Sequence, residues 1–246
     1  MHDTLVKHST ALSKVYFTKE FPGFEIESKW TLLTQNPVPI LMGMRSDIQK
    51  GLWQDYEVAT AMGKLPVGVR FFDMKFQFWG TEQNGNLEQV AMVACLPDKD
   101  RYQLAFKSRQ KKLLYASPSL HNPPLVRPES RTGAWINNNE VIKEIHRVFP
   151  RAYVVGEIRR QKCFTYFTSK RSYRNFSVSA DFCYYSNKSL SQVEIEYKGR
   201  RGCWLPDTTG VEIIQDFVEI HLILEQLYSN ILIPTSQTKF EWITDN

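Results

Sequence analysis

The sequence predicts an α+β fold in which long antiparallel strands dominate and a few helices pack outside them. Strand-like patterns recur along most of the chain, whereas only three segments show helical periodicity. The chain has 246 residues, 42% hydrophobic and 23% charged, so it can bury a large core without disulfides. We expect one domain over residues 1–246, with a long loop insertion around 117–139, where prolines cluster.

The first expected strand covers residues 24–30 and alternates strictly between two faces. Phe24, Ile26 and Trp30 share one face, and Glu25 and Glu27 point to the other face. Later strands follow from alternation, from aromatic content or from flanking turn residues. They are expected at residues 69–79, 89–96, 102–109, 153–167, 175–184, 192–198 and 238–243.

Three helices are expected. The first covers 46–63, because Ser46 and Gln49 fit a capping box. The second covers 137–150, and the third and longest begins at residue 209 and has an extended apolar face. All three are expected to lie outside the strands.

Composition excludes several classes of protein. The formal net charge is +5, which permits a phosphate-bearing ligand without demanding one. The four cysteines show no metal-binding spacing, so we expect no zinc site. No run of about 18 apolar residues occurs, so we expect no membrane association. These features predict a cytoplasmic protein with reduced thiols.

Two segments share an unusual charge pattern. Residues 25–29 are Glu-Ile-Glu-Ser-Lys, and residues 194–198 are Glu-Ile-Glu-Tyr-Lys. In a strand, each would place two carboxylates and one ammonium on the same face. Neighbouring like charges are unfavourable unless a cation compensates them. Solvent would screen them on an open sheet face, but inside a barrel a metal ion or a basic lining would have to do so.

Other charged residues of the expected strands supply such a lining. Lys107 and Arg109 alternate on one strand, and Arg160 and Lys162 alternate on another. A barrel interior that mixes acidic and basic groups is a poor structural core. It suits a polyphosphate with a divalent metal, because carboxylates bind the metal while lysine and arginine bind phosphate oxygens.

The ordered set of charged residues resembles the triphosphate tunnel metalloenzymes, also called the CYTH superfamily. The first strand has the pattern Glu25-x-Glu27-x-Lys29, and the basic strands, paired carboxylates and a late lysine follow in the family's order. The match spans roughly residues 20–243. It implies a closed eight-stranded antiparallel β-barrel, or tunnel, that binds a triphosphate.

The resemblance also implies roles for individual residues. Mg²⁺ or Mn²⁺ would be held by four carboxylates: Glu25, Glu27, Glu194 and Glu196. The catalytic candidates are Lys29 and Asp181, the latter as a further metal ligand or as the group that positions water. Phosphates would be bound by Lys29, Lys75, Lys107, Arg109, Arg160, Lys162 and Lys239.

The chain departs from the family pattern in one strand, and another strand is ambiguous. The family places an Arg-x-Arg pair on the strand before the lysine strand, but residues 89–96 contain no basic residue. Either Lys75 is the substitute or this phosphate contact is absent. The strand at 156–162 permits two orientations. We expect Arg160 and Lys162 to point inward, because a carboxylate at Glu157 would oppose phosphate.

The predicted function is metal-dependent hydrolysis of a triphosphate, either inorganic triphosphate or a nucleoside or RNA 5′-triphosphate. One alternative is a class IV-type adenylyl cyclase that converts ATP to cyclic AMP and pyrophosphate. The other is a non-catalytic module that binds polyphosphate or nucleotide. The expected partner is therefore a triphosphate-containing small molecule or an RNA 5′ end, and the sequence leaves the oligomeric state open.

Overall fold

The computed structural model describes residues 17–18, 21, 23–34, 36–59, 68–96, 99–107, 112–113, 124–131, 134–201 and 211–245. Eight strands pair in one closed antiparallel ring, which confirms the predicted barrel. In ring order they are β2 (Phe24–Leu32), β11 (Lys188–Arg201), β10 (Arg174–Tyr185), β9 (Tyr153–Ser169), β4 (Arg70–Gln83), β5 (Asn86–Leu96), β6 (Arg101–Lys107) and β8 (Leu125–Arg131).

Short strands extend this ring at several places. They are β1 (Phe17–Thr18) beside β11, β3 (Tyr56–Val58) beside β9, β7 (Lys112–Leu113) beside β8, and β12 (Leu232–Thr235) beside β2. The closing contact pairs β2 with β11, so the first long strand lies against one that is distant in sequence.

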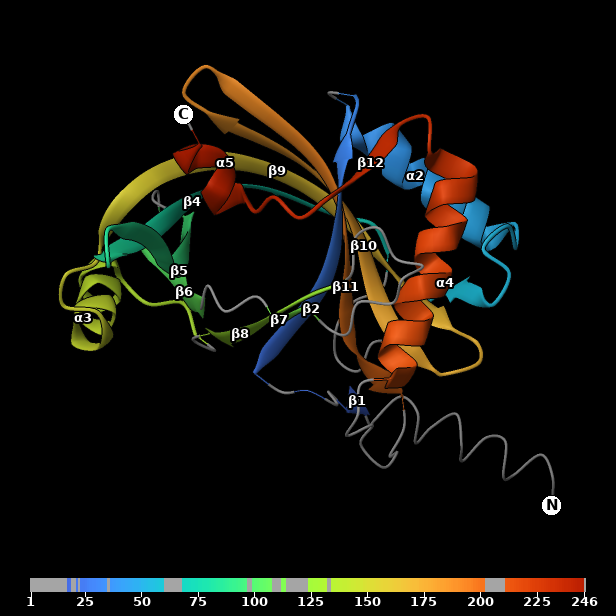
Figure 1. The fold of residues 1–246 in the computed structure, drawn as a ribbon, viewed down its shortest axis with the longest axis horizontal. Helices are drawn as coiled ribbons and strands as arrows, with labels where there is room; N and C mark the ends of the chain where they lie inside the picture. The colour runs from blue at the N-terminus through green and yellow to red at the C-terminus, as the bar shows by residue number, and fades with distance from the viewer. Residues whose placement is uncertain are drawn as a thin grey trace.

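Four helices among the described residues pack around the barrel: α2 (Pro37–Gln49), α3 (Asn138–Val148), α4 (Val211–Tyr228) and α5 (Lys239–Thr244). In Figure 1, α2 and α4 lie together on one side of the barrel, and α3 lies on the opposite side near β5 and β6. The predicted α+β class with outer helices is confirmed. Among the described residues, none of the helices has the length and apolar character needed to cross a bilayer.

The largest apolar core lies outside the barrel, between its wall and the helices α2 and α4. Strand β2 supplies Ile26 and Trp30 to this core. Its alternate residues Glu25, Glu27 and Lys29 line the barrel interior instead. Because successive side chains of a strand point to opposite faces, burying Ile26 and Trp30 under the helices forces the charged residues inward.

The first helix lies earlier than predicted. α2 begins at Pro37, which suits the first turn of a helix because it has no N–H to leave unpaired there. Leu41, Met44 and Ile48 form its buried face, and the helix ends at Gln49. The prediction of a helix over 46–63 was therefore wrong for residues 50–59, where Tyr56 lies in β3, and residues 60–63 lie outside the described residues.

The two other helix predictions are confirmed. Asn137 and Glu140 form a capping box at the start of α3, where each side chain accepts a hydrogen bond from the other residue's backbone N–H. The third expected helix corresponds to α4, of which the described part begins at Val211. Its buried face includes Ile213, Phe217 and Leu224.

Two local predictions are corrected. Residues 239–244 form helix α5 and not a final strand, because Thr238 and Glu241 make a capping box that fixes the first turn. Part of the expected loop at 117–139 is strand β8, whereas residues 114–123 lie outside the described residues. Pro128 within β8 argues against a strand in sequence, since proline cannot donate a ladder hydrogen bond.

Candidate active site

The barrel encloses a cavity of about 300 Å³ whose wall is formed by inward-facing side chains of the ring strands and by the start of α5. One part of the wall is strongly charged and contains eight basic and four acidic residues. The acidic ones are Glu25, Glu27, Glu194 and Glu196, and the basic ones are Lys29, Lys107, Arg127, Arg131, Arg160, Lys162, Lys198 and Lys239. Basic groups outnumber acidic ones, so the cavity suits an anion.

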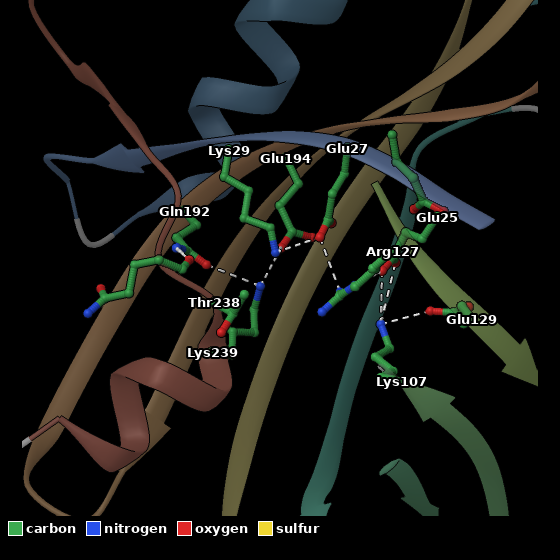
Figure 2. A network of polar contacts seen from close by, with 12 residues as sticks. Glu25, Glu27, Lys29, Lys107, Arg127, Glu129, Gln192, Glu194, Thr238 and Lys239 are labelled. Carbon is green, nitrogen blue, oxygen red and sulfur yellow. Dashed lines mark hydrogen bonds and ion pairs between the residues drawn. The ribbon is translucent and has the colours of Figure 1, made fainter. Parts of the chain in front are cut away.

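The paired strands β2 and β11 bring the two predicted acidic segments together. In their register, Glu194 lies opposite Lys29, and Glu196 lies opposite Glu27. Lys29 Nζ is 2.9 Å from Glu27 Oε1 and 3.4 Å from Glu194 Oε1, as Figure 2 shows. The predicted convergence of carboxylates from distant parts of the chain is therefore confirmed.

Glu194 is also surrounded by basic groups from two further elements. Its carboxylate lies 2.6 Å from Lys239 Nζ of α5, and 2.9 Å from Arg160 Nη2 and 3.5 Å from Lys162 Nζ of β9. Burial would raise the pKa of Glu194, but Lys239, Lys29 and the β9 cations hold it well below its ordinary value. Glu194 is therefore ionised at neutral pH and gathers the cations of the cavity around it.

Asp181, one of the two predicted catalytic residues, is fully buried and is not among the residues that line the cavity. One oxygen lies 2.9 Å from Lys239 Nζ and also accepts a hydrogen bond from Arg160. Burial and Arg160 oppose the charge of Lys239, but Asp181 and Glu194 raise its pKa above the ordinary value. In this place Asp181 can hold the side chains of Lys239 and Arg160 in position, whereas it has no direct contact with the cavity in which water would react.

A second group of charges surrounds Glu25. Lys107 Nζ lies 3.1 Å from Glu25 and 2.8 Å from Glu129, and Arg127 donates a hydrogen bond to Glu25 and lies 3.1 Å from Glu27. Burial would raise the pKa of Glu25, but Arg127 and Lys107 hold it well below its ordinary value. Figure 2 shows Glu25, Lys107, Arg127 and Glu129 at one end of the polar network.

The charged residues of β8 were not predicted as part of the site. Arg127 and Arg131 line the cavity, and Glu129 between them binds Lys107. Arg127, Glu129 and Arg131 are spaced two residues apart within the segment that was predicted to be a loop. This alternation is typical of a strand and could have identified them. Lys198 also lines the cavity and forms an ion pair with Glu196. Burial would raise the pKa of Glu196, but Lys198 lowers it.

Five of the seven predicted phosphate-binding residues line the cavity, and Lys75 does not. Arg160 and Lys162 point inward as expected, whereas Arg159 forms an ion pair with Asp73 on the outside. Lys75 lies on the outer face of β4, half exposed and 3.1 Å from Glu157, because its neighbours in the strand take the inward positions. Its proposed role as substitute for the missing arginine pair is therefore wrong. Arg109 lies outside the described residues.

Much of the remaining cavity wall is apolar. Strand β4 supplies Phe72, Met74, Phe76 and Phe78, and the strand that lacks the family's arginine pair places Met92 and Ala94 on the cavity. The guanidinium carbon of Arg160 lies 5.6 Å from the centre of the Phe76 ring, within cation–π range. Charged and apolar walls thus face one another across one small space.

No protein-family model and no curated protein sequence matches the chain. Among solved structures, a candidate adenylyl cyclase from Hippeastrum with a dominant triphosphatase activity matches at 12% identity and a TM-score of 0.47, covering 89% of this chain and 95% of that one. A candidate adenylate cyclase from Bacillus halodurans matches at 12% identity and a TM-score of 0.45, over 89% and 98% of the two chains. An RNA triphosphatase of S. pombe matches at 13% identity and a TM-score of 0.35, over 93% of this chain and 91% of that one.

The closed eight-stranded antiparallel ring is the architecture that the family resemblance of the charged residues implied. The chemistry of the tunnel has to be judged from the chain's own residues.

Metal ions are implied by this resemblance, and the tunnel carboxylates provide the appropriate donor chemistry. Carboxylate oxygens are what Mg²⁺ and Mn²⁺ prefer, and Glu27 and Glu196 lie directly opposite one another. Within the described part of the chain, no three His, Cys, Asp or Glu side chains are arranged to hold an ion. The carboxylates instead contact basic groups, as Glu196 does with Lys198. A metal ion would therefore have to replace some of these ion pairs.

Proposed function

We propose that this chain binds a triphosphate in the barrel and hydrolyses its terminal phosphoryl bond with the help of Mg²⁺ or Mn²⁺. The observation that supports the proposal is the excess of basic over acidic side chains in the cavity inside the barrel. Phosphoryl transfer depends mainly on positioning and on neutralising charge, and a rigid barrel lined by lysine and arginine supplies both.

Individual residues have distinct parts in this proposal. Lys29, Arg160, Lys162 and Lys239 form one cationic group around Glu194 and would bind phosphate oxygens. Glu25, Glu27, Glu194 and Glu196 would hold the metal ion, which supplies charge neutralisation at the phosphates. Asp181 would act behind them as a positioning residue for Arg160 and Lys239.

The test measures phosphate release from tripolyphosphate and nucleoside triphosphates with Mg²⁺ or Mn²⁺. Loss of one oxyanion-stabilising donor typically lowers an enzyme's rate about a hundredfold. We expect a loss of the same size when one preorganised cation is removed from the reacting phosphates. Lys239→Ala is therefore expected to reduce the rate to this extent, while Lys75→Ala on the outer face leaves it unchanged. Thermal melting of both variants verifies folding, and chelation by EDTA is expected to abolish turnover.

A second candidate is a binding module without turnover. It is favoured by the fact that the carboxylates contact basic groups and form no ready metal site among the described residues. Tight tripolyphosphate binding with no product would support it and contradict hydrolysis. Cyclic AMP with pyrophosphate from ATP would instead establish the cyclase alternative.

A further inference from the structure

The rim of the cavity has an aromatic pair that the phosphate chemistry does not use. The inward-facing side chains of β4 become more exposed toward the start of the strand. The exposed fraction is 2% for Phe78, 9% for Phe76 and 44% for Phe72. Phe72 therefore lies where the cavity opens to solvent. Its ring stacks on Phe164 of β9, with ring centres 5.4 Å apart and planes within 18°.

This pair offers a flat surface to a ligand. Phe164 and Tyr166 also line the cavity, and their rings meet edge to face at 5.3 Å, which fixes the orientation of Phe164. Phe72 belongs to none of the buried apolar clusters found among the described residues. Stacking against another aromatic ring would bury its exposed surface.

Lys162 connects this surface to the charged part of the cavity. Its Cα lies opposite that of Phe72 across β4 and β9, and its Nζ is 6.0 Å from the centre of the Phe164 ring. The same Nζ lies 3.5 Å from Glu194, in the cationic group. One ligand could therefore stack a ring on Phe72 and Phe164 and place its nearest phosphate at Lys162.

The wall opposite the charged group disfavours a ligand that is anionic along its whole length. Met92 of β5 and Phe78 of β4 are neighbours in register, and both line the cavity without offering a charge. Inorganic triphosphate would also leave the aromatic rim without a partner. An ester with an aromatic group would use the rim.

We propose that the rim of Phe72 and Phe164 stacks the aromatic ring of an organic triphosphate, so that the chain prefers such an ester to inorganic triphosphate. The inference rests on the proposed function, because it assigns the phosphates to the cationic group around Glu194. Free nucleoside triphosphates and RNA 5′ ends share the required chemistry.

Calorimetric titration of the full chain with ATP and with tripolyphosphate in Mg²⁺ tests the proposal. Wild type is expected to bind ATP more tightly than tripolyphosphate. Stacking of a base on an aromatic side chain is worth about tenfold or more in affinity, so Phe72→Ala is expected to reduce the affinity ratio of ATP to tripolyphosphate by about tenfold. Phe72→Trp keeps the ring and is expected to keep the ratio.

Phe71→Ala is the matched control, because Phe71 is the adjacent exposed phenylalanine on the opposite face of β4. It is expected to leave the ratio unchanged. An unchanged ratio in Phe72→Ala, or equal wild-type affinities, would overturn the rim proposal while tripolyphosphate binding still supported the proposed function. Failure of both ligands to bind would instead refute the proposed function. Titration with triphosphate-ended RNA, compared with ATP, distinguishes the two sources of the ring.

Discussion

At the level of residues, the protonation of the tunnel is set by pairs of opposite charge. Glu25 and Glu194 keep pKa values well below normal despite burial, because lysine and arginine side chains surround them. Lys162 shows the opposite balance, since burial and then Arg160 lower its pKa in spite of nearby acids. An anionic ligand would supply the missing negative charge beside Lys162.

His221 provides a prediction outside the cavity. It lies on α4 with its ring 4.6 Å from Trp30, and no hydrogen-bond partner of its Nε2 is found among the described residues. Burial lowers its pKa from 6.5 to about 4, so the unfolded chain takes up a proton at a higher pH than the folded chain does. Stability is therefore expected to fall by about 1 kcal/mol between pH 7.5 and pH 5.5.

Urea denaturation at these two pH values measures this loss. His221→Phe keeps a ring against Trp30 and cannot titrate, so its stability is expected to change less over the same range. The two proteins should differ by a constant amount between pH 8 and pH 9, where the histidine is neutral in both states. An identical pH dependence of the two proteins would contradict the assignment.

At the level of elements, α5 places its first residue in the tunnel through its cap. The Thr238 hydroxyl accepts a hydrogen bond from the Glu241 backbone N–H, and this first turn presents Lys239 to Glu194 and Asp181. Such a cap stabilises a helix by about 1 kcal/mol. In a helix as short as α5, the cap therefore contributes directly to the position of the lysine.

Thr238→Ala is expected to cost about 1 kcal/mol in stability and to weaken tripolyphosphate binding, because Lys239 is no longer held in place. Thr238→Ser keeps the hydroxyl and is expected to retain both properties. Asn137→Ala removes the equivalent cap of α3, whose capping box has the same form. This control should lose similar stability in urea denaturation and keep its affinity. Equal losses of affinity in the two capping variants would refute the positioning role.

At the level of the whole molecule, the barrel closes where β2 pairs with β11, and buried ion pairs cross this junction. Lys29 of β2 bridges Glu27 on its own strand to Glu194 on β11. Because the pKa of Glu194 is lowered in the folded state, its contribution is complete above the ordinary value of 4.5. It is lost as the pH falls below that value toward the folded-state pKa.

Glu194→Gln tests this junction. The variant leaves Lys29, Lys239 and Arg160 without their shared partner, and breaking a buried ion pair typically costs about 3–5 kcal/mol. We expect this loss at neutral pH and a shallower decline of stability between pH 5 and pH 3 than in wild type. Glu157→Gln alters an exposed pair with Lys75 and serves as the control, with little effect expected. A wild-type acid profile in Glu194→Gln would contradict the prediction.

Much of this architecture follows from local patterns. The alternation in residues 24–30 predicted which side chains of β2 face inward. In the strand at 156–162 alternation allowed two orientations, and the charge of Glu157 predicted the observed one, with Arg160 and Lys162 inward. Capping chemistry located α3. Where the local patterns were weak or conflicting, prediction failed: Pro128 obscured β8, and alternating residues at 238–243 suggested a strand where a capping box starts α5.

The sequence by itself determined the face on which each strand carries its charges, because side-chain alternation depends only on local backbone geometry. Only the tertiary structure decided which faces meet. The register of β2 against β11 placed Lys29 opposite Glu194, and the packing of α5 brought Lys239 to Asp181. In β4 the residues on either side of Lys75 took the cavity positions, so Lys75 points outward. The contacts of Lys29 and Lys239 join residues far apart in the chain, so they depend on ring closure and helix packing and not on any local pattern.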